Sequence, residues 1–209
     1  MRHAHSTLIL AAAFAAALPA LAQTPPANVP GAPDLSRVAA GTYAVEPNHT
    51  QVVWSVNHLG FTMLTGIFAS STGTMTLDPK HPGAAVVAID FPLAKVTTTR
   101  EAFTTHLQTA ELLDAVNHPV ASFRSSRVVV SGKTAKIFGN LMLRGITKPV
   151  VLDARFMGAG INPNSKKPTI GFEATASIKR SDYGIVYVLP NVADRVDLQI
   201  HAAFERSDK

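Results

Sequence analysis

The stretch from residue 51 to residue 68, QVVWSVNHLGFTMLTGIF, alternates between apolar and polar positions. Its first half places a mostly apolar set on one side of an extended chain: Val52, Trp54, Val56 and His58. This period of two predicts a β-strand with one face out of water. Gly60 interrupts the pattern, so we predict two strands joined at a sharp corner. The second of these two strands could continue through residues 73–77.

The same alternation recurs along most of the chain after residue 40. Strand patterns cover 41–46, 85–91, 119–130, 136–144 and 150–157, and the two clearest cover 172–179 and 196–205. Strands with one apolar, buried face and one polar, solvent-exposed face, repeated this often, predict either an antiparallel sheet that closes on itself or a sandwich. A barrel of about eight strands either fills its interior with side chains or holds one small ligand.

One stretch, residues 100–116, departs from the period of two. Its apolar residues recur at helical spacing: Phe103, Leu107, Ala110 and Leu113. Thr99 is placed to cap the start of a helix, and Glu101 lies in its first turn. We therefore predict an all-β fold with one or two short helices that pack over or across an open end.

The first 22 residues predict an export signal. Arg2 and His3 precede an apolar run over residues 8–18, and the sequence Ala-Leu-Ala at 20–22 provides a cleavage site. The apolar run is too short to span a bilayer comfortably, so a secretory signal peptide explains it better than a membrane anchor. Residues 23–40 contain four prolines and little that could pack, which predicts a flexible linker. The expected organisation is 1–22 signal peptide, 23–40 Pro-rich linker and 41–209 folded domain.

The composition excludes several kinds of chemistry. The chain has no cysteine, so a thiol nucleophile, a thiolate zinc site and a thiolate-bound iron–sulfur cluster are excluded. The formal net charge is +5, but the basic residues do not form a tract, and a nucleic-acid site would need them clustered with aromatics. We predict no nucleic-acid partner. Transient contact with a membrane surface and homodimerisation stay open.

Candidate catalytic groups are few. His58 and His106 could act as acid and base, but no histidine pair has the i, i+4 zinc spacing with an intervening glutamate. Ser122, Ser125 and Ser181 lie in no G-x-S-x-G setting. The sequence therefore predicts no catalytic residue, no metal and no cofactor, and we do not expect an enzyme.

Several motifs together resemble a known family. They are YAVEPNHT at 43–50, HLG at 58–60, PVASFRS at 119–125, GNLMLRGITKPV at 139–150 and RSDYG at 180–184. In this order and spacing they resemble the YceI-like family of polyisoprenoid-binding periplasmic proteins, over nearly all of residues 41–204. The resemblance implies a lipocalin-like antiparallel barrel of about eight strands whose interior takes a long isoprenoid chain.

A cavity of this kind needs apolar and aromatic walls with a few polar groups at its mouth. The wall candidates are Trp54, Met63, Phe68, Ile89, Phe91, Phe123, Phe138, Met142, Phe156 and Phe172, and His58 and His106 are candidates for the mouth. The alternative is that these side chains pack against one another and fill the barrel. Arg180 and Asp182 are expected to form a salt bridge that fixes a corner, although a cation near the mouth could instead meet a phosphate or quinone oxygen.

We therefore expect a periplasmic binding protein that carries or sequesters an isoprenoid lipid, of the quinone or polyprenyl phosphate type, in a β-barrel cavity. One alternative is an enzyme that acts on a small lipophilic substrate with His106 or His58 as base. Another is a filled barrel that serves as a protein-interaction module and exposes an apolar patch.

Overall fold

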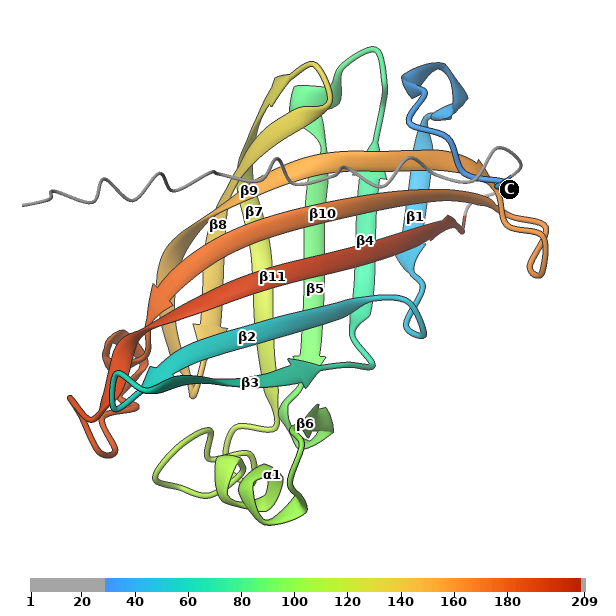
Figure 1. Ribbon diagram of the computed structural model, residues 1–209. Coiled ribbons are helices and arrows are strands. Elements are labelled where there is room, and N and C mark those ends of the chain that lie inside the picture. Colours follow the sequence, from blue (N-terminus) through green and yellow to red (C-terminus); the bar gives the residue numbers. More distant parts are fainter. Residues whose placement is uncertain (1–28, 208–209) are drawn as a thin grey trace, which may run out of the picture.

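A single sheet makes up almost the whole domain. The computed structural model describes residues 29–207, and the predicted signal peptide lies outside this range. Within it, eleven strands form one antiparallel sheet in the order β1-β4-β5-β7-β8-β9-β10-β11-β2-β3-β6, and pairing between β1 and β11 closes it (Figure 1). The prediction of an all-β fold is confirmed: residues 29–207 form a closed antiparallel barrel of eight strands with a single short α-helix.

The barrel closes where the first strand meets the last. Tyr43 pairs with Arg206, and Val45 pairs with Phe204. The long strands on one side of the barrel cross the shorter ones steeply, as Figure 1 shows. The barrel strands are β1 (Gly41–Val45), β4 (Thr72–Leu77), β5 (Val86–Pro92), β7 (Val120–Ser131), β8 (Thr134–Leu143), β9 (Ile146–Ile161), β10 (Pro168–Lys179) and β11 (Val192–Arg206).

Three further strands extend the sheet beside β11. They are β2 (Gln51–His58), β3 (Thr62–Phe68) and β6 (Val96–Thr97). The corner predicted at Gly60 is present, and Leu59 and Gly60 both adopt a positive φ there. The expectation that the second strand continues to residue 77 is wrong. Ser70 takes a φ of 58° and turns the chain, so β3 pairs with β2 and β6 whereas β4 pairs with β1 and β5.

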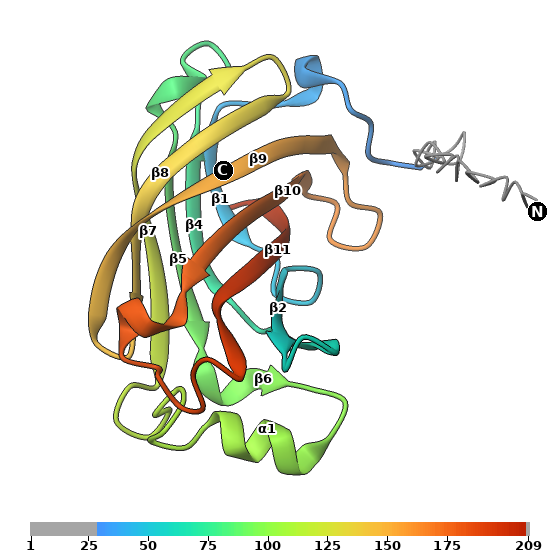
Figure 2. The same cartoon turned by 60° about the vertical axis from the view of Figure 1, so that its left-hand side comes forward.

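The connection between β5 and β7 covers one end of the barrel, and we call residues 93–119 the cover segment. It begins with the 3-10 turn η3 (Leu93–Lys95), contains α1 (Glu101–Leu107) and continues in turns. Figures 1 and 2 both place α1 below that end, beside β6. The predicted cap at Thr99 is wrong, because Arg100 holds the N-cap position without a side-chain hydrogen bond. Thr104 instead accepts a hydrogen bond from the backbone of Thr98 at 3.0 Å.

The described part of the predicted linker lies against the barrel at the opposite end. It contains the 3-10 turns of η1 (Leu35–Arg37), and Ala32 exchanges backbone hydrogen bonds of 3.1 and 2.9 Å with Ala159 of β9. Gly160 permits this approach, because a Cβ there would lie 2.1 Å from the carbonyl oxygen of Pro30. Two other 3-10 turns, η2 (Pro82–Ala84) and η4 (Arg180–Tyr183), lie in loops.

Two clusters of buried side chains occupy the interior. The first includes Tyr43, Met75, Phe156, Ile170 and Phe204, with Val38 from beside η1 packed against it. The second includes Trp54, Leu93, Leu113, Leu143 and Tyr183, with Phe103 and Leu107 of α1 packed against it. The cover segment thus belongs to the second cluster, which marks the α1 end of the barrel.

Candidate functional site

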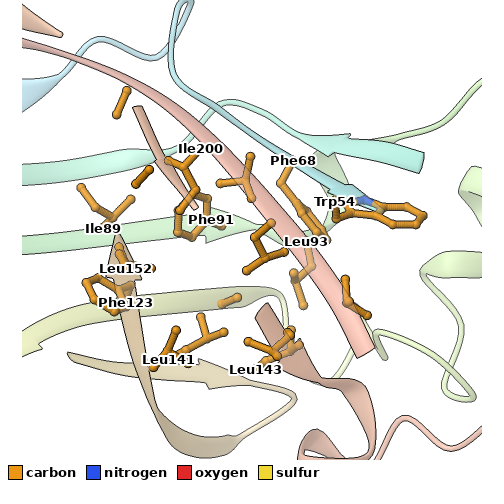
Figure 3. A pocket seen from close by; sticks show the side chains of 18 of the residues that line it. Trp54, Phe68, Ile89, Phe91, Leu93, Phe123, Leu141, Leu143, Leu152 and Ile200 are labelled. Atoms are coloured by element: carbon orange, nitrogen blue, oxygen red, sulfur yellow. The ribbon is translucent and has the colours of Figure 1, made fainter. Parts of the chain in front are cut away.

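The barrel interior is hollow. A cavity of about 260 Å³ is lined by side chains from both clusters, and every lining residue except Arg180 is apolar. Figure 3 shows Phe91, Phe123 and Leu141 reaching into this space from different strands. The inward side chains therefore do not fill the barrel completely.

Strand alternation builds the walls. On β10, Phe172, Ala174 and Ile178 line the cavity, while Glu173 and Thr175 belong to the other face of the strand. The same alternation on β11 brings in five lining residues, Val196, Leu198, Ile200, Ala202 and Phe204. Ala174 also lies opposite Ala154 of β9, and these small side chains leave open space between the larger ones.

Two glycines make room for the aromatic walls. A Cβ at Gly66 would lie 2.4 Å from Cζ2 of Trp54, and a Cβ at Gly139 would lie 2.4 Å from Cζ of Phe123. The indole and the phenyl ring therefore lie across glycine backbone on β3 and β8. A glycine in a strand often marks such a close approach.

The cover segment closes the cavity with four leucines, Leu93, Leu107, Leu112 and Leu113. Arg144, in the β8–β9 turn, donates from Nη1 to the carbonyl oxygen of Leu112 at 2.9 Å. Aromatic contacts hold α1 as well: the rings of Phe103 and Trp54 lie 6.4 Å apart, edge to face. Besides the short pairing of β6 with β3, the segment is thus attached to the rest of the sheet mainly by side-chain packing.

Six of the twelve predicted site residues line the cavity. They are Trp54, Phe68, Ile89, Phe91, Phe123 and Phe172. Phe156 is buried beside the cavity, with its ring 5.9 Å from that of Phe172. His58 ends β2, opposite Thr62 and Val192, and does not line the cavity. His106 lies on α1, with its ring 5.2 Å from that of Tyr187, and it does not line the cavity either.

The three remaining wall candidates face away from the cavity because of strand parity. On β8, Ile137 and Leu141 line the cavity, so Phe138 and Met142 lie on the opposite face. The guanidinium of Arg127 covers the ring of Phe138 at 3.8 Å. On β3, Met63 is out of phase with Phe68 and is 47% exposed.

Aliphatic residues make up most of the wall that the sequence reasoning missed. They include Leu93, Leu112, Ile137, Leu141, Leu143 and Leu152. The signal that could have found those on strands is parity: once Phe123 is assigned inward, the register Phe123↔Leu141 assigns Leu141 and then Leu143. Those in the cover segment have no such period.

Arg180 is the one charged residue in the cavity wall, and it is 6% exposed. Its Nε, Nη1 and Nη2 donate to the carbonyl oxygens of Ala193 at 2.9 Å, Ile185 at 3.1 Å and Val192 at 2.7 Å. Burial lowers the pKa of the guanidinium, and the nearby carboxylate of Asp194 acts in the opposite direction. Even so lowered, an arginine remains protonated in a protein.

The predicted salt bridge between Arg180 and Asp182 is wrong. The two residues would share a side only in an extended chain, whereas here they lie in the 3-10 turn η4. Asp182 is exposed, and the carboxylate of Asp194 accepts hydrogen bonds from the backbone N–H and the hydroxyl of Ser181, both at 2.8 Å.

Two searches of the described residues bear on other kinds of site. In residues 29–207, no group of three or more histidine, aspartate or glutamate side chains could hold a metal ion. Over the same range, none of the helices combines the length and the apolar character needed to cross a bilayer.

The fold and the site thus define a closed antiparallel barrel around an apolar cavity. Residues 43–204 match the YceI-like domain, and the chain belongs to this family. It is 38% identical to Protein YceI of Salmonella arizonae over 155 residues, which are 74% of this chain and 81% of that protein. The family resemblance predicted from the motifs is confirmed.

Solved structures share the fold. The chain superposes on BcnA of Burkholderia cenocepacia with a TM-score of 0.68 at 19% identity, covering 76% of this chain and 98% of that one. It superposes on a polyisoprenoid binding domain from Saccharophagus degradans, implicated in plant cell wall breakdown, with a TM-score of 0.61 at 14% identity, covering 79% and 98% of the two chains.

Proposed function

We propose that this protein is a non-enzymatic, periplasmic carrier or sequesterer of an isoprenoid lipid of the quinone or polyprenyl phosphate type. The observation that carries the proposal is the apolar cavity of about 260 Å³ with a single charged residue in its wall. Membership of the YceI-like family and the fold shared with a polyisoprenoid binding domain support it. The periplasmic location rests on the predicted signal peptide, and homodimerisation stays a prediction.

The size of the cavity sets the length of tail it can take. One water-sized group needs about 10–15 Å³ of such space, so the cavity has room for on the order of 20 of them. An isoprene unit has five carbons, which corresponds to about four units. Burying about 20 such carbons is worth roughly 16 kcal/mol relative to water, before the cost of association. Relative to a bilayer the tail exchanges one hydrocarbon environment for another, so transfer in both directions is cheap, as a carrier requires.

A series of isoprenoid alcohols of increasing length tests the proposal. Affinity should rise steeply with each added isoprene unit and level off at about four units, when the cavity is full. Trp54, the one tryptophan of the sequence, lines the cavity and provides the fluorescence signal. Affinity that does not depend on tail length, or absence of saturable binding, would contradict the proposal.

Loading from a membrane needs a surface that can meet it, and we propose the α1 end. Several large apolar side chains are exposed there: Phe61 at 87%, Val116 at 89% and Val186 at 59%. The β2–β3 turn and the loop before β11 lie together, since Leu59 N–H donates to the carbonyl oxygen of Asn191 at 2.7 Å. The loop before β11 also contacts α1, where the rings of Tyr187 and His106 lie 5.2 Å apart, so transient membrane contact would occur near the leucines that close the cavity.

The exposed apolar side chains at the α1 end are also what the protein-interaction alternative expects, but the cavity argues against both alternatives. Neither His58 nor His106 lines the cavity, so neither is placed to act as a base on a molecule inside it. A barrel filled with side chains, as the protein-interaction alternative requires, does not agree with the cavity.

A further inference from the structure

The cavity stops short of the end of the barrel that lies opposite α1. Met75 and Phe204 of the first buried cluster line the cavity, but the three most deeply buried members of that cluster do not. These three come from strand ends: Tyr43 near the start of β1, Ala159 near the end of β9 and Ile170 near the start of β10. They are 0%, 2% and 1% exposed, and Ala159 pairs with Ile170. We call these three side chains the end layer, because they lie between the cavity and this end of the barrel.

The N-terminal segment, residues 29–40, lies against this end at a strand edge. The pairing of β9 with β8 ends at Arg155, whereas β9 continues to Ile161 beside β10. A strand edge without a neighbour offers its backbone N–H and C=O groups to another extended chain. Ala32 occupies the edge at Ala159, with backbone hydrogen bonds in both directions. The segment therefore binds directly beside a member of the end layer.

Two further contacts join the segment to the end layer. Val38 packs against the first cluster, and the hydroxyl of Tyr43 donates a hydrogen bond to the carbonyl oxygen of Ala39 at 2.7 Å. The segment is also held together internally, since Nη1 of Arg37 donates to the carbonyl oxygen of Pro30 at 3.3 Å. Parting the end layer would therefore require the segment to lose packing and hydrogen bonds.

A lipid tail that enters past the cover segment meets the end layer at the far side of the cavity. Carbons that do not fit inside stay in contact with water, and each of them lowers affinity relative to a bilayer. We propose that the N-terminal segment, by holding the end layer in place, sets the longest isoprenoid tail that the protein binds, at about four units. The inference rests on the proposed function, because it assigns a length limit to the same cavity. The segment precedes residues 43–204, so this limit is additional to the fold that the family shares.

Gly160→Ala should release the segment and leave the barrel intact. A Cβ at Gly160 would lie 2.1 Å from the carbonyl oxygen of Pro30 and 2.8 Å from its carbonyl carbon, and these backbone atoms cannot rotate away as a side chain can. Gly160 does not adopt a positive φ, so alanine fits the backbone of β9. Gly171→Ala is the matched control, because Gly171 lies opposite Gly158 on β10 and the atom nearest to its new Cβ is 3.8 Å away.

Competition among tails measures the length limit. The full-length chain is incubated with phosphatidylcholine vesicles that hold equal amounts of isoprenoid alcohols shorter and longer than about four units. The protein is then separated from the vesicles, and its bound alcohols are extracted and counted by mass spectrometry. The wild type and Gly171→Ala should retain tails of up to about four units. In Gly160→Ala, the proportion of tails that are about two units longer should rise about tenfold or more.

Trypsin reports separately whether the segment is released. Cleavage after Arg37 creates a new N-terminus at Val38, and this cleavage should be faster in Gly160→Ala than in the wild type or Gly171→Ala. Val38→Ser removes one apolar contact of the segment and should shift the retained tails in the same direction. This second variant and the length profile of the wild type keep the test valid if Gly160→Ala misfolds.

The outcomes separate the length limit from the proposed function. If Gly160→Ala is cleaved faster after Arg37 but retains the same tails as the wild type, the segment only covers a strand edge and the inference is refuted. Unchanged cleavage of Gly160→Ala overturns the inference too, because the segment is then not held across Gly160. A wild type that retains tails well beyond about four units would refute the length limit while the lipid carrier stands. If no alcohol is retained, the proposed function itself fails.

Discussion

Filling the cavity with side chains should abolish lipid binding without unfolding the barrel. Ala154 and Ala174 lie opposite each other on β9 and β10, and both are buried and line the cavity. Leucine at both positions adds about six carbons to a space that holds on the order of 20 small groups. Displacing about six methylenes of a tail at about 0.8 kcal/mol each removes roughly 5 kcal/mol. The expected loss of affinity is on the order of several thousandfold.

The assay is titration of the double variant with an isoprenoid alcohol of about four units, followed by Trp54 fluorescence. Thr175→Leu is the matched control, since Thr175 is exposed on the other face of β10 and should leave binding unchanged. Because the added side chains fill apolar space, the melting temperature of the double variant should stay the same or rise. A folded double variant that still binds with wild-type affinity would refute the claim that the tail lies in this cavity.

Three further predictions concern packing, pH and membrane contact. Gly139→Ala should lower the free energy of unfolding by about 1–3 kcal/mol, because the new Cβ would lie 2.4 Å from the ring of Phe123. Gly171→Ala is the control and should be nearly neutral, because the atom nearest to its new Cβ lies 3.8 Å away. Equal melting temperatures of the two variants would contradict this. Burial raises the pKa of Asp194, but the two hydrogen bonds from Ser181 together with the positive charges of Arg180 and Lys179 outweigh it and hold that pKa below the usual 3.8. A carboxylate with a lowered pKa stabilises the fold at neutral pH, and this stabilisation is lost as the pH falls through the folded-state pKa. Asp194→Asn should therefore lower the free energy of unfolding by about 1 kcal/mol at neutral pH and by progressively less in acid. A difference between wild type and variant that does not change with pH in urea denaturation would be inconsistent with this. Phe61→Ser should reduce co-sedimentation with phospholipid vesicles and slow the transfer of lipid from vesicles to the protein. Its affinity for the isoprenoid alcohol in solution should not change. Unaltered transfer would argue against membrane contact at the α1 end.

The sequence predicts the barrel well because strand alternation is a local property. The runs at 172–179 and 196–205 reappear within β10 and β11, and alternate residues of both strands line the cavity. The break between β3 and β4 comes at Ser70, which begins the Ser-Ser-Thr-Gly run at 70–73; such a run is a loop signal that the alternation argument passed over.

The site was predictable only in part. Choosing wall residues by aromatic type found Phe68 and Phe123 but also took Phe138, whose position on β8 places it on the opposite face. Applying parity along each strand would have corrected this. The bonds of Arg180 to three backbone carbonyl groups, in contrast, depend on how η4 meets the start of β11, which no local pattern encodes.

The most direct test of the account is to produce the full-length chain in a bacterium, purify the folded protein, extract it with organic solvent and weigh the extract by mass spectrometry. The account predicts a lipid whose fragments differ by isoprene units, present at close to one molecule per protein. An extract without any such lipid, from folded protein purified without detergent, would contradict it.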